Sequence, residues 1–135
     1  MPRESHAWAV AREALAPFGV LHRVENPIVI GFPDALYCLF GVSGLIESKA
    51  TVGTLKLEQV LWAEEWSAAG GLVFTLLRAD GIWFLYDAAG TRQLYDKVAE
   101  PVPLVRAAGA FPLKEMLRHL APVNRRRAMF GRKAT

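Results

Sequence analysis

The sequence predicts a single α/β domain in which a mixed β-sheet is flanked by helices. Its 135 residues, 53% of them hydrophobic and 21% charged, suit one globular domain. The predicted elements follow one another as helix, strand, strand, strand, helix, strand. A helix between the third and fourth strands allows those two strands to lie parallel, which makes the sheet mixed. We place the domain at 1–121 and a basic tail at 122–135.

The first predicted element is a helix over residues 4–16. These residues are good helix formers, and Pro17 and Gly19 close the segment. At 100° per residue, Glu4 falls on the apolar stripe of this helix, whereas Glu13 falls on the opposite side. We therefore expect the first of these acids to face the interior and the second to face water.

Three strands are predicted next, at 20–24, 35–40 and 45–49. Residues 41–44 have glycine at both ends and predict a hairpin turn between the second and third strands. The third strand has apolar neighbours, so we expect it near the sheet centre. Cys38 lies within the second strand, and its apolar surroundings predict a small core side chain.

The second half of the chain predicts fewer elements. We expect a helix at 57–69, strands at 72–77 and 82–86, turns at 80–81 and 87–90, and a short helix at 111–120. The apolar stripe of the 57–69 helix is predicted to comprise Leu57, Val60, Leu61 and Ala68. Residues 95–109 contain two prolines and no clean periodicity, so we assign them no element.

Charge is distributed unevenly along the chain. The five basic residues beyond Ala121, with no acid among them, give this segment +5, which leaves −2 for the rest of a chain whose net charge is +3. A basic tail is compatible with a nucleic-acid partner, although a tail that only improves solubility is an equally good interpretation.

Several classes of protein are not expected. No apolar run approaches the ~20 residues that a membrane helix needs, and residues 1–6 do not resemble a signal peptide. Cys38 is the only cysteine, so no internal disulfide can form, and we expect a cytoplasmic protein. The three histidines lack zinc-ligand spacing, and glycine-rich phosphate loops are absent, so neither zinc nor a nucleotide cofactor is expected.

Two acids and a lysine carry the functional signal. Glu47 and Lys49 are two apart on one strand and share a face, while Ser48 points away. Asp34 opens the neighbouring strand, and a tight hairpin would bring it beside Glu47. Two carboxylates among apolar neighbours need an ion pair or a metal, and Mg²⁺ prefers such oxygen ligands. Spacing alone leaves a simple ion pair with Lys49 as an open alternative.

These residues form a recognisable pattern. Gly31-Phe32-Pro33-Asp34, followed after twelve residues by Glu47-Ser48-Lys49, resembles the signature of the PD-(D/E)XK nuclease superfamily. The pattern is most similar to the VRR-NUC type and to archaeal Holliday-junction resolvases, which also place a glutamine on the following helix. Gln59, with Trp62, matches that element. The resemblance covers roughly 4–86 and implies a restriction-endonuclease-like core of order α-β-β-β-α-β.

The resemblance implies a site and an activity. Asp34 and Glu47 would bind Mg²⁺ or Mn²⁺, assisted by Glu4 and the carbonyl of Ser48, with Lys49 catalytic and Gln59 orienting it or contacting a phosphate. The expected activity is metal-dependent, structure-selective DNA endonuclease, of the Holliday-junction or flap type. The expected partner is branched DNA, and a homodimer in a bacterial or phage-infected cell is the expected setting. Ser48 replaces the apolar residue that the family commonly places between the acid and the lysine.

Other residues could take part in DNA binding. Candidate phosphate contacts are Arg23, Lys56, Arg78, Arg125, Arg126 and Arg127. Tryptophans could stack on unpaired bases, although the helical spacing of Trp62 and Trp66 favours core or dimer contacts. Two rival interpretations remain open: a non-catalytic DNA-binding module that keeps the nuclease fold, and a sequence-specific restriction-type endonuclease.

Overall fold

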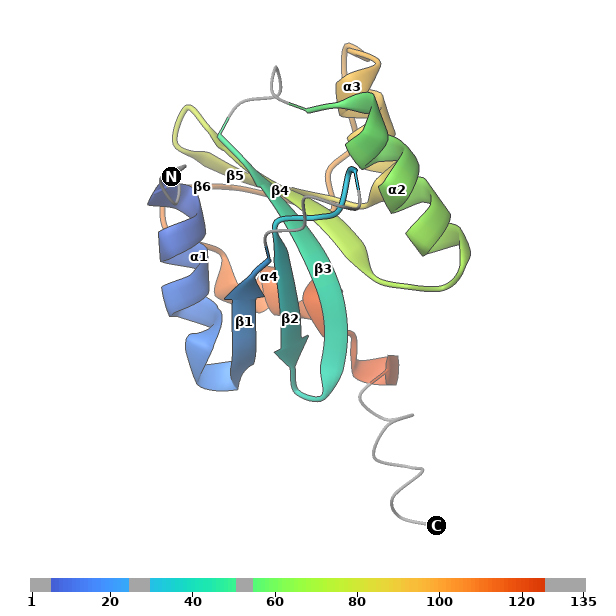
Figure 1. Cartoon of the computed structure of the whole chain (residues 1–135). Helices are drawn as coiled ribbons and strands as arrows, with labels where there is room; N and C mark the ends of the chain where they lie inside the picture. The colour runs from blue at the N-terminus through green and yellow to red at the C-terminus, as the bar shows by residue number, and fades with distance from the viewer. Residues whose placement is uncertain (1–5, 25–29, 51–54, 126–135) are drawn as a thin grey trace.

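A six-stranded sheet forms the centre of the computed structural model, with helices on both of its faces (Figure 1). The structure describes residues 6–24, 30–50 and 55–125. In chain order the elements are α1 (His6–Leu15), η1 (Ala16–Phe18), β1 (Gly19–Arg23), β2 (Ala35–Leu39), β3 (Val42–Lys49), α2 (Leu57–Ala68), β4 (Val73–Ala79), β5 (Ile82–Tyr86), α3 (Ala88–Tyr95), β6 (Val105–Ala108) and α4 (Leu113–Leu120).

The strands lie in the order β1-β2-β3-β4-β5-β6, and the sheet is mixed. β3 and β4 are parallel, since α2 carries the chain back across the sheet between them, and the other neighbouring pairs are antiparallel. The α/β class, the parallel crossover and the central position of β3 are therefore confirmed.

The larger core lies between the sheet and the helices α1 and α4. Trp8, Tyr37, Trp83 and Met116 are fully buried there. α2 and α3 cover the other face, because Val73 and Leu77 of β4 point toward them while the alternating residues between point into the larger core. On the α2 side, the side chains of Val20, His22, Leu36 and Cys38 in β1 and β2 are exposed.

Tyr37 ties the two sides of the larger core together. Its hydroxyl donates a hydrogen bond to the carbonyl of Leu120 at the end of α4, at 2.7 Å. The ring crosses Gly44 on the neighbouring strand, where a Cβ would lie 2.3 Å from the tyrosine oxygen. Burial raises the pKa of the Tyr37 hydroxyl well above its usual range. The hydroxyl is therefore a permanent donor to α4.

The hairpin between β2 and β3 differs from the prediction of a turn at 41–44. Phe40 and Gly41 alone make the turn, with φ of 51° and 78°, and Val42 already pairs with Leu39. Two consecutive residues of positive φ form the tight hairpin turn whose twist matches that of the flanking strands. The predicted turn at Asp80-Gly81 is confirmed and has the same geometry.

The prediction that Cys38 is a core residue is wrong: its side chain is exposed. Leu36 and Cys38 lie on the exposed face of β2, whereas the buried residues are the alternating set of Ala35, Tyr37 and Leu39. Phe40 belongs to the turn, and its ring packs against that of Phe18. Both sets are apolar, so the alternation alone did not show which set faces the core.

The predicted apolar stripe of α2 is also wrong in part. Val60 and Ala63 are the buried positions, whereas Leu57 and Leu61 are 40% and 49% exposed. The turn predicted at 87–90 is the beginning of α3, with Asp87 as its N-cap accepting from the backbone N–H of Gly90. β6 lies within the segment to which no element was assigned, and the short helix predicted at 111–120 is confirmed as α4.

None of the helices in the described part of the chain has the length and apolar character that crossing a membrane would require.

Candidate active site

Glu47 is the centre of a polar cluster where β2 begins and β3 ends. Only 5% of its surface is exposed, although a carboxylate normally prefers water. It points to the α2 face of the sheet, as do Lys49 on the same strand and Asp34 immediately before β2. The structure therefore brings together the two acids and the lysine that the sequence singled out.

Backbone and side chain of Asp34 both bind the neighbouring strand. Its N–H donates to Oε2 of Glu47 at 3.0 Å, and its Oδ2 accepts from the N–H of Ser48 at 3.1 Å. On the other side, the carbonyl of Asp34 accepts from the N–H of Val24 at 2.7 Å, which attaches it to the end of β1. Asp34 is thus fixed on both sides by the sheet.

Gln59 connects the acids to α2. Its Nε2 donates to Oε1 of Glu47 at 2.5 Å, and its own Oε1 accepts from the N–H of Lys56 at 2.9 Å. The second bond is part of a capping box at the first turn of the helix, so the amide is held at both ends. Lys49 completes the set, with Nζ 3.2 Å from Oε1 of Glu47.

Gly31 permits the approach of the preceding loop to α2. Its φ is +85°, and a Cβ there would lie 2.3 Å from the carbonyl oxygen of Glu58 and 3.1 Å from the N–H nitrogen of Gln59. Only glycine tolerates both the backbone angle and the contact. The glycine of the Gly31-to-Asp34 motif therefore sets the position of Asp34 relative to Gln59.

The charged form of the Glu47 carboxyl is disfavoured in this site. Burial, followed by the like charge of Asp34, raises the pKa of Glu47 to about 7, while Lys49 acts in the opposite direction. A second positive charge beside Glu47 would act in the same direction as Lys49 and stabilise the charged carboxylate.

The donor set suits a hard cation. Asp34 and Glu47 supply carboxylate oxygens, and Mg²⁺ typically takes one or two protein carboxylates and keeps several waters. Within 6–24, 30–50 and 55–125, no group of three or more acids, histidines or cysteines converges in a way that could hold a metal. Glu4, predicted as the third acid, lies outside the described residues.

Ser48 itself points away from the cluster, as predicted. It shares its face of β3 with Ile46, which is part of the larger core, and its hydroxyl is buried without a hydrogen-bond partner among the described residues. Only its backbone is therefore available to the site.

Two threonines that the sequence did not single out lie behind Glu47. Thr75 is its register partner on β4, and its hydroxyl lies 2.8 Å from that of Thr91 on α3. Together with Glu47 and Gln59 they line an internal cavity of about 10 Å³, at the lower limit for a single water. Their signal in the sequence was weak, since α3 was not predicted and buried threonines are common in strands.

The candidate DNA-binding residues do not all lie on the side of the acids. Arg78 packs over the ring of Trp83, 4.7 Å from its centroid, and Arg23 pairs with Ala35, which places both on the α1 and α4 face. Lys56 precedes α2 beside the site, and Arg125 donates to the carbonyl of Gly70 at 2.8 Å. Arg126 and Arg127 lie outside the described residues.

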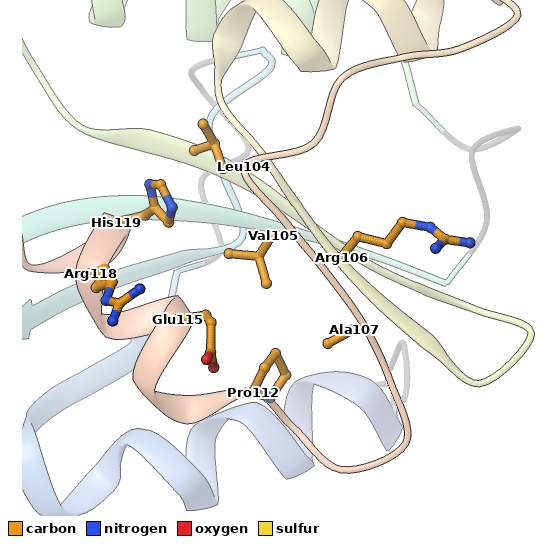
Figure 2. A pocket seen from close by; sticks show the side chains of 8 residues that line it. All are labelled: Leu104, Val105, Arg106, Ala107, Pro112, Glu115, Arg118 and His119. Carbon is orange, nitrogen blue, oxygen red and sulfur yellow. The ribbon is translucent and has the colours of Figure 1, made fainter.

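A separate hollow of about 420 Å³ lies between β6 and α4, with Glu115, Arg118 and His119 of α4 along one wall and Val105 and Ala107 of β6 opposite (Figure 2). It contains none of the residues that the sequence assigned to the site.

Comparison with known proteins finds no match, since no protein-family model and no curated protein matches the chain.

Proposed function

We propose that the chain is a metal-dependent DNA endonuclease with a restriction-endonuclease-like core, which hydrolyses phosphodiester bonds in branched or flapped DNA. The observation that carries the proposal is the convergence of Asp34, Glu47, Lys49 and Gln59 through direct polar contacts. The element order α1, β1, β2, β3, α2, β4 supports it, since this is the order that the resemblance to PD-(D/E)XK nucleases implies.

Each residue has a defined role in this proposal. Asp34, Glu47 and the Ser48 carbonyl, with Glu4, would hold Mg²⁺ or Mn²⁺. The bound cation would supply Lewis-acid polarisation of the scissile phosphate and a lowered pKa for the attacking water. Lys49, 3.2 Å from Glu47, would stabilise negative charge that develops on the phosphoryl oxygens. Gln59 would keep the Glu47 carboxylate oriented.

Substrate choice in this proposal rests on DNA shape. The described residues form the sheet and four helices that cover it, without an appended element that would read base edges. The basic residues from Arg125 onward would contact phosphates. A homodimer, in which each copy cuts one strand, would suit a four-way junction.

One observation favours a second candidate, the non-catalytic DNA-binding module. Both carboxylate oxygens of Glu47 already accept hydrogen bonds within the protein, from Asp34 and Gln59, and Lys49 forms an ion pair with it. Such a closed set could persist for structural reasons alone. The two candidate functions differ in whether the cluster cleaves DNA.

The test is cleavage of end-labelled four-way junction, flap and linear duplex DNA, in Mg²⁺ and in chelator. The proposal predicts metal-dependent cleavage that favours the branched substrates. Glu47→Ala and Lys49→Ala should each lower the rate by about 100-fold or more, because each removes a group at the reacting phosphate. Gln59→Ala should lower it by about 10- to 100-fold, because it only positions Glu47.

The matched control is Glu58→Ala, which removes an exposed acid from the same helix next to Gln59. It should cleave at the wild-type rate. Tight binding of branched DNA without cleavage in Mg²⁺ or Mn²⁺ would instead establish the non-catalytic module.

A further inference from the structure

An apolar groove begins close to the acid cluster and extends along the open face of β2 and β3. Its volume is about 270 Å³, and its walls are Phe32, Leu36, Trp66 and Leu72. Arg125 also lines it, held by its hydrogen bond to the carbonyl of Gly70. The groove therefore combines aromatic walls with a fixed guanidinium group.

Three aromatic rings form a continuous series beside this groove. Phe32 packs edge-on against Trp62 at 5.2 Å, and Trp62 stacks on Trp66 at 5.0 Å with 17° between the planes. Trp66 nevertheless remains 42% exposed. Trp62 covers part of the Trp66 ring, and the ring surface that remains exposed opens into the groove.

Packing fixes the Trp66 ring against the backbone. A Cβ on Gly71 would lie 2.1 Å from the indole nitrogen, so the indole lies directly on this glycine. An exposed tryptophan that is held in place by Trp62 and Gly71 loses little side-chain freedom when a planar ligand stacks on it.

Two segments of the chain connect the groove to the acid cluster, the loop before β2 and the strand β3. Phe32 precedes Asp34 by two residues, and Leu45, which also lines the groove, precedes Glu47 by two residues on the same face of β3. Two residues of strand span about 6.6 Å. A single DNA strand whose backbone lies at the acids can therefore place a neighbouring unpaired base in the groove.

We propose that this groove is a stacking subsite for an unpaired base of the DNA strand whose backbone reaches the acid cluster. The inference rests on the proposed function and deepens it, because it names the feature of branched DNA that the site recognises. Aromatic faces accept any base, and the guanidinium of Arg125 faces the phosphates that accompany it. The continuing sequence adds four basic residues and no acid, which favours a phosphate-bearing ligand over an apolar peptide.

The first test compares two flap substrates that differ only in the first two unpaired positions, which carry either bases or abasic sites. Wild type should cleave the base-bearing flap faster. Trp66→Ala should reduce this preference by about 5- to 150-fold, the range for loss of one stacked base, up to the point where the two substrates become equivalent. Trp66→Phe should retain most of it, because a phenyl ring still stacks.

The second test measures binding without cleavage. The flap carries 2-aminopurine at the same positions, and the Glu47→Ala protein binds it in chelator. Stacking should quench the 2-aminopurine fluorescence, and Trp66→Ala in the same background should abolish the quenching. Leu61→Ala is the matched control, since Leu61 is an exposed side chain of α2 outside the groove and should change neither readout.

Failure of the two proposals can be told apart. If wild type cleaves nothing, the endonuclease proposal fails and the fluorescence measurement alone decides the groove. If cleavage occurs but Trp66→Ala leaves the preference and the quenching unchanged, the groove inference is overturned. It is also overturned if wild type sediments as a dimer and Trp66→Ala as a monomer, because the groove is then an interface between copies.

Discussion

Replacing Gly31 by alanine should disturb the candidate site more than any other single-methyl change in the described chain. The new Cβ would lie 2.3 Å from the carbonyl oxygen of Glu58, a distance that side chains essentially never adopt. The loop or α2 must therefore move by about 1 Å. The backbone angle of +85° adds about 1–2 kcal/mol for any residue with a Cβ.

Gly109 supplies a matched reference. It has the same φ of +85°, but a Cβ there meets nothing within 4 Å. Gly109→Ala should therefore cost only the conformational term of about 1–2 kcal/mol, whereas Gly31→Ala should cost about 2–4 kcal/mol once the displacement is added. The difference between the two variants isolates the contact with α2.

The assays are urea unfolding and single-turnover cleavage of a flap substrate in Mg²⁺. Gly31→Ala should reduce the cleavage rate by about 100-fold, because a displacement of about 1 Å moves Asp34 away from the Glu47 carboxylate, which Gln59 orients. Gly109→Ala should cleave like wild type at temperatures where it is folded. Equal loss of stability in the two variants, or full activity of Gly31→Ala, would refute this account of the loop.

Three further predictions concern stability. Tyr37→Phe should lower the free energy of unfolding by about 1–2 kcal/mol, because the buried Leu120 carbonyl loses its donor; an unchanged urea midpoint would contradict this. Ser48→Ala should raise it by about 1 kcal/mol and leave cleavage unchanged, because it removes a buried hydroxyl without a partner while keeping the carbonyl; a loss of activity would show that the hydroxyl acts at the site. The pKa of Glu47 is raised from its ordinary value of 4.5 to about 7 in the folded state, so the folded protein binds this proton more tightly than the unfolded chain does. The contribution of the protonated carboxyl to the free energy of unfolding is therefore fully present below pH 4.5 and is lost as the pH rises through 7. In chelator, wild type should therefore lose about 3 kcal/mol relative to Glu47→Gln between pH 4.5 and pH 8, and parallel curves for the two proteins would contradict the raised pKa.

The arrangement of the site could be predicted from the sequence where the spacing of residues along a strand determines the face of the sheet on which they lie. Glu47 and Lys49 share a face because they are two apart on a strand, and a hairpin must return Asp34 to their side. The same rule places Arg78, which alternates with Phe74 and Leu76, on the opposite face. Strand parity alone would have excluded it from the site.

The features that could not be predicted from the sequence depend on contacts between distant parts of the chain. α3 contains Gly90, a poor helix former, at a position where Tyr86 and the carbonyl of Val102 leave little room for a side chain. β6 is a four-residue edge strand after two prolines, too short for a periodic signal. The open face of β2 could not be predicted, because only the position of α2 determines which apolar set is left uncovered.

The most direct test of the central claim is the single-turnover rate of flap cleavage at increasing Mg²⁺, measured for wild type and Glu47→Gln. The amide keeps the size of the side chain and one acceptor oxygen but removes the charge. If Asp34 and Glu47 form a metal-binding catalytic pair, wild type should show a rate that rises and saturates with Mg²⁺ and vanishes in chelator. Glu47→Gln should then be slower by about 100-fold or more at saturation. Equal rates for the two proteins, or a rate that does not depend on Mg²⁺, would contradict the claim.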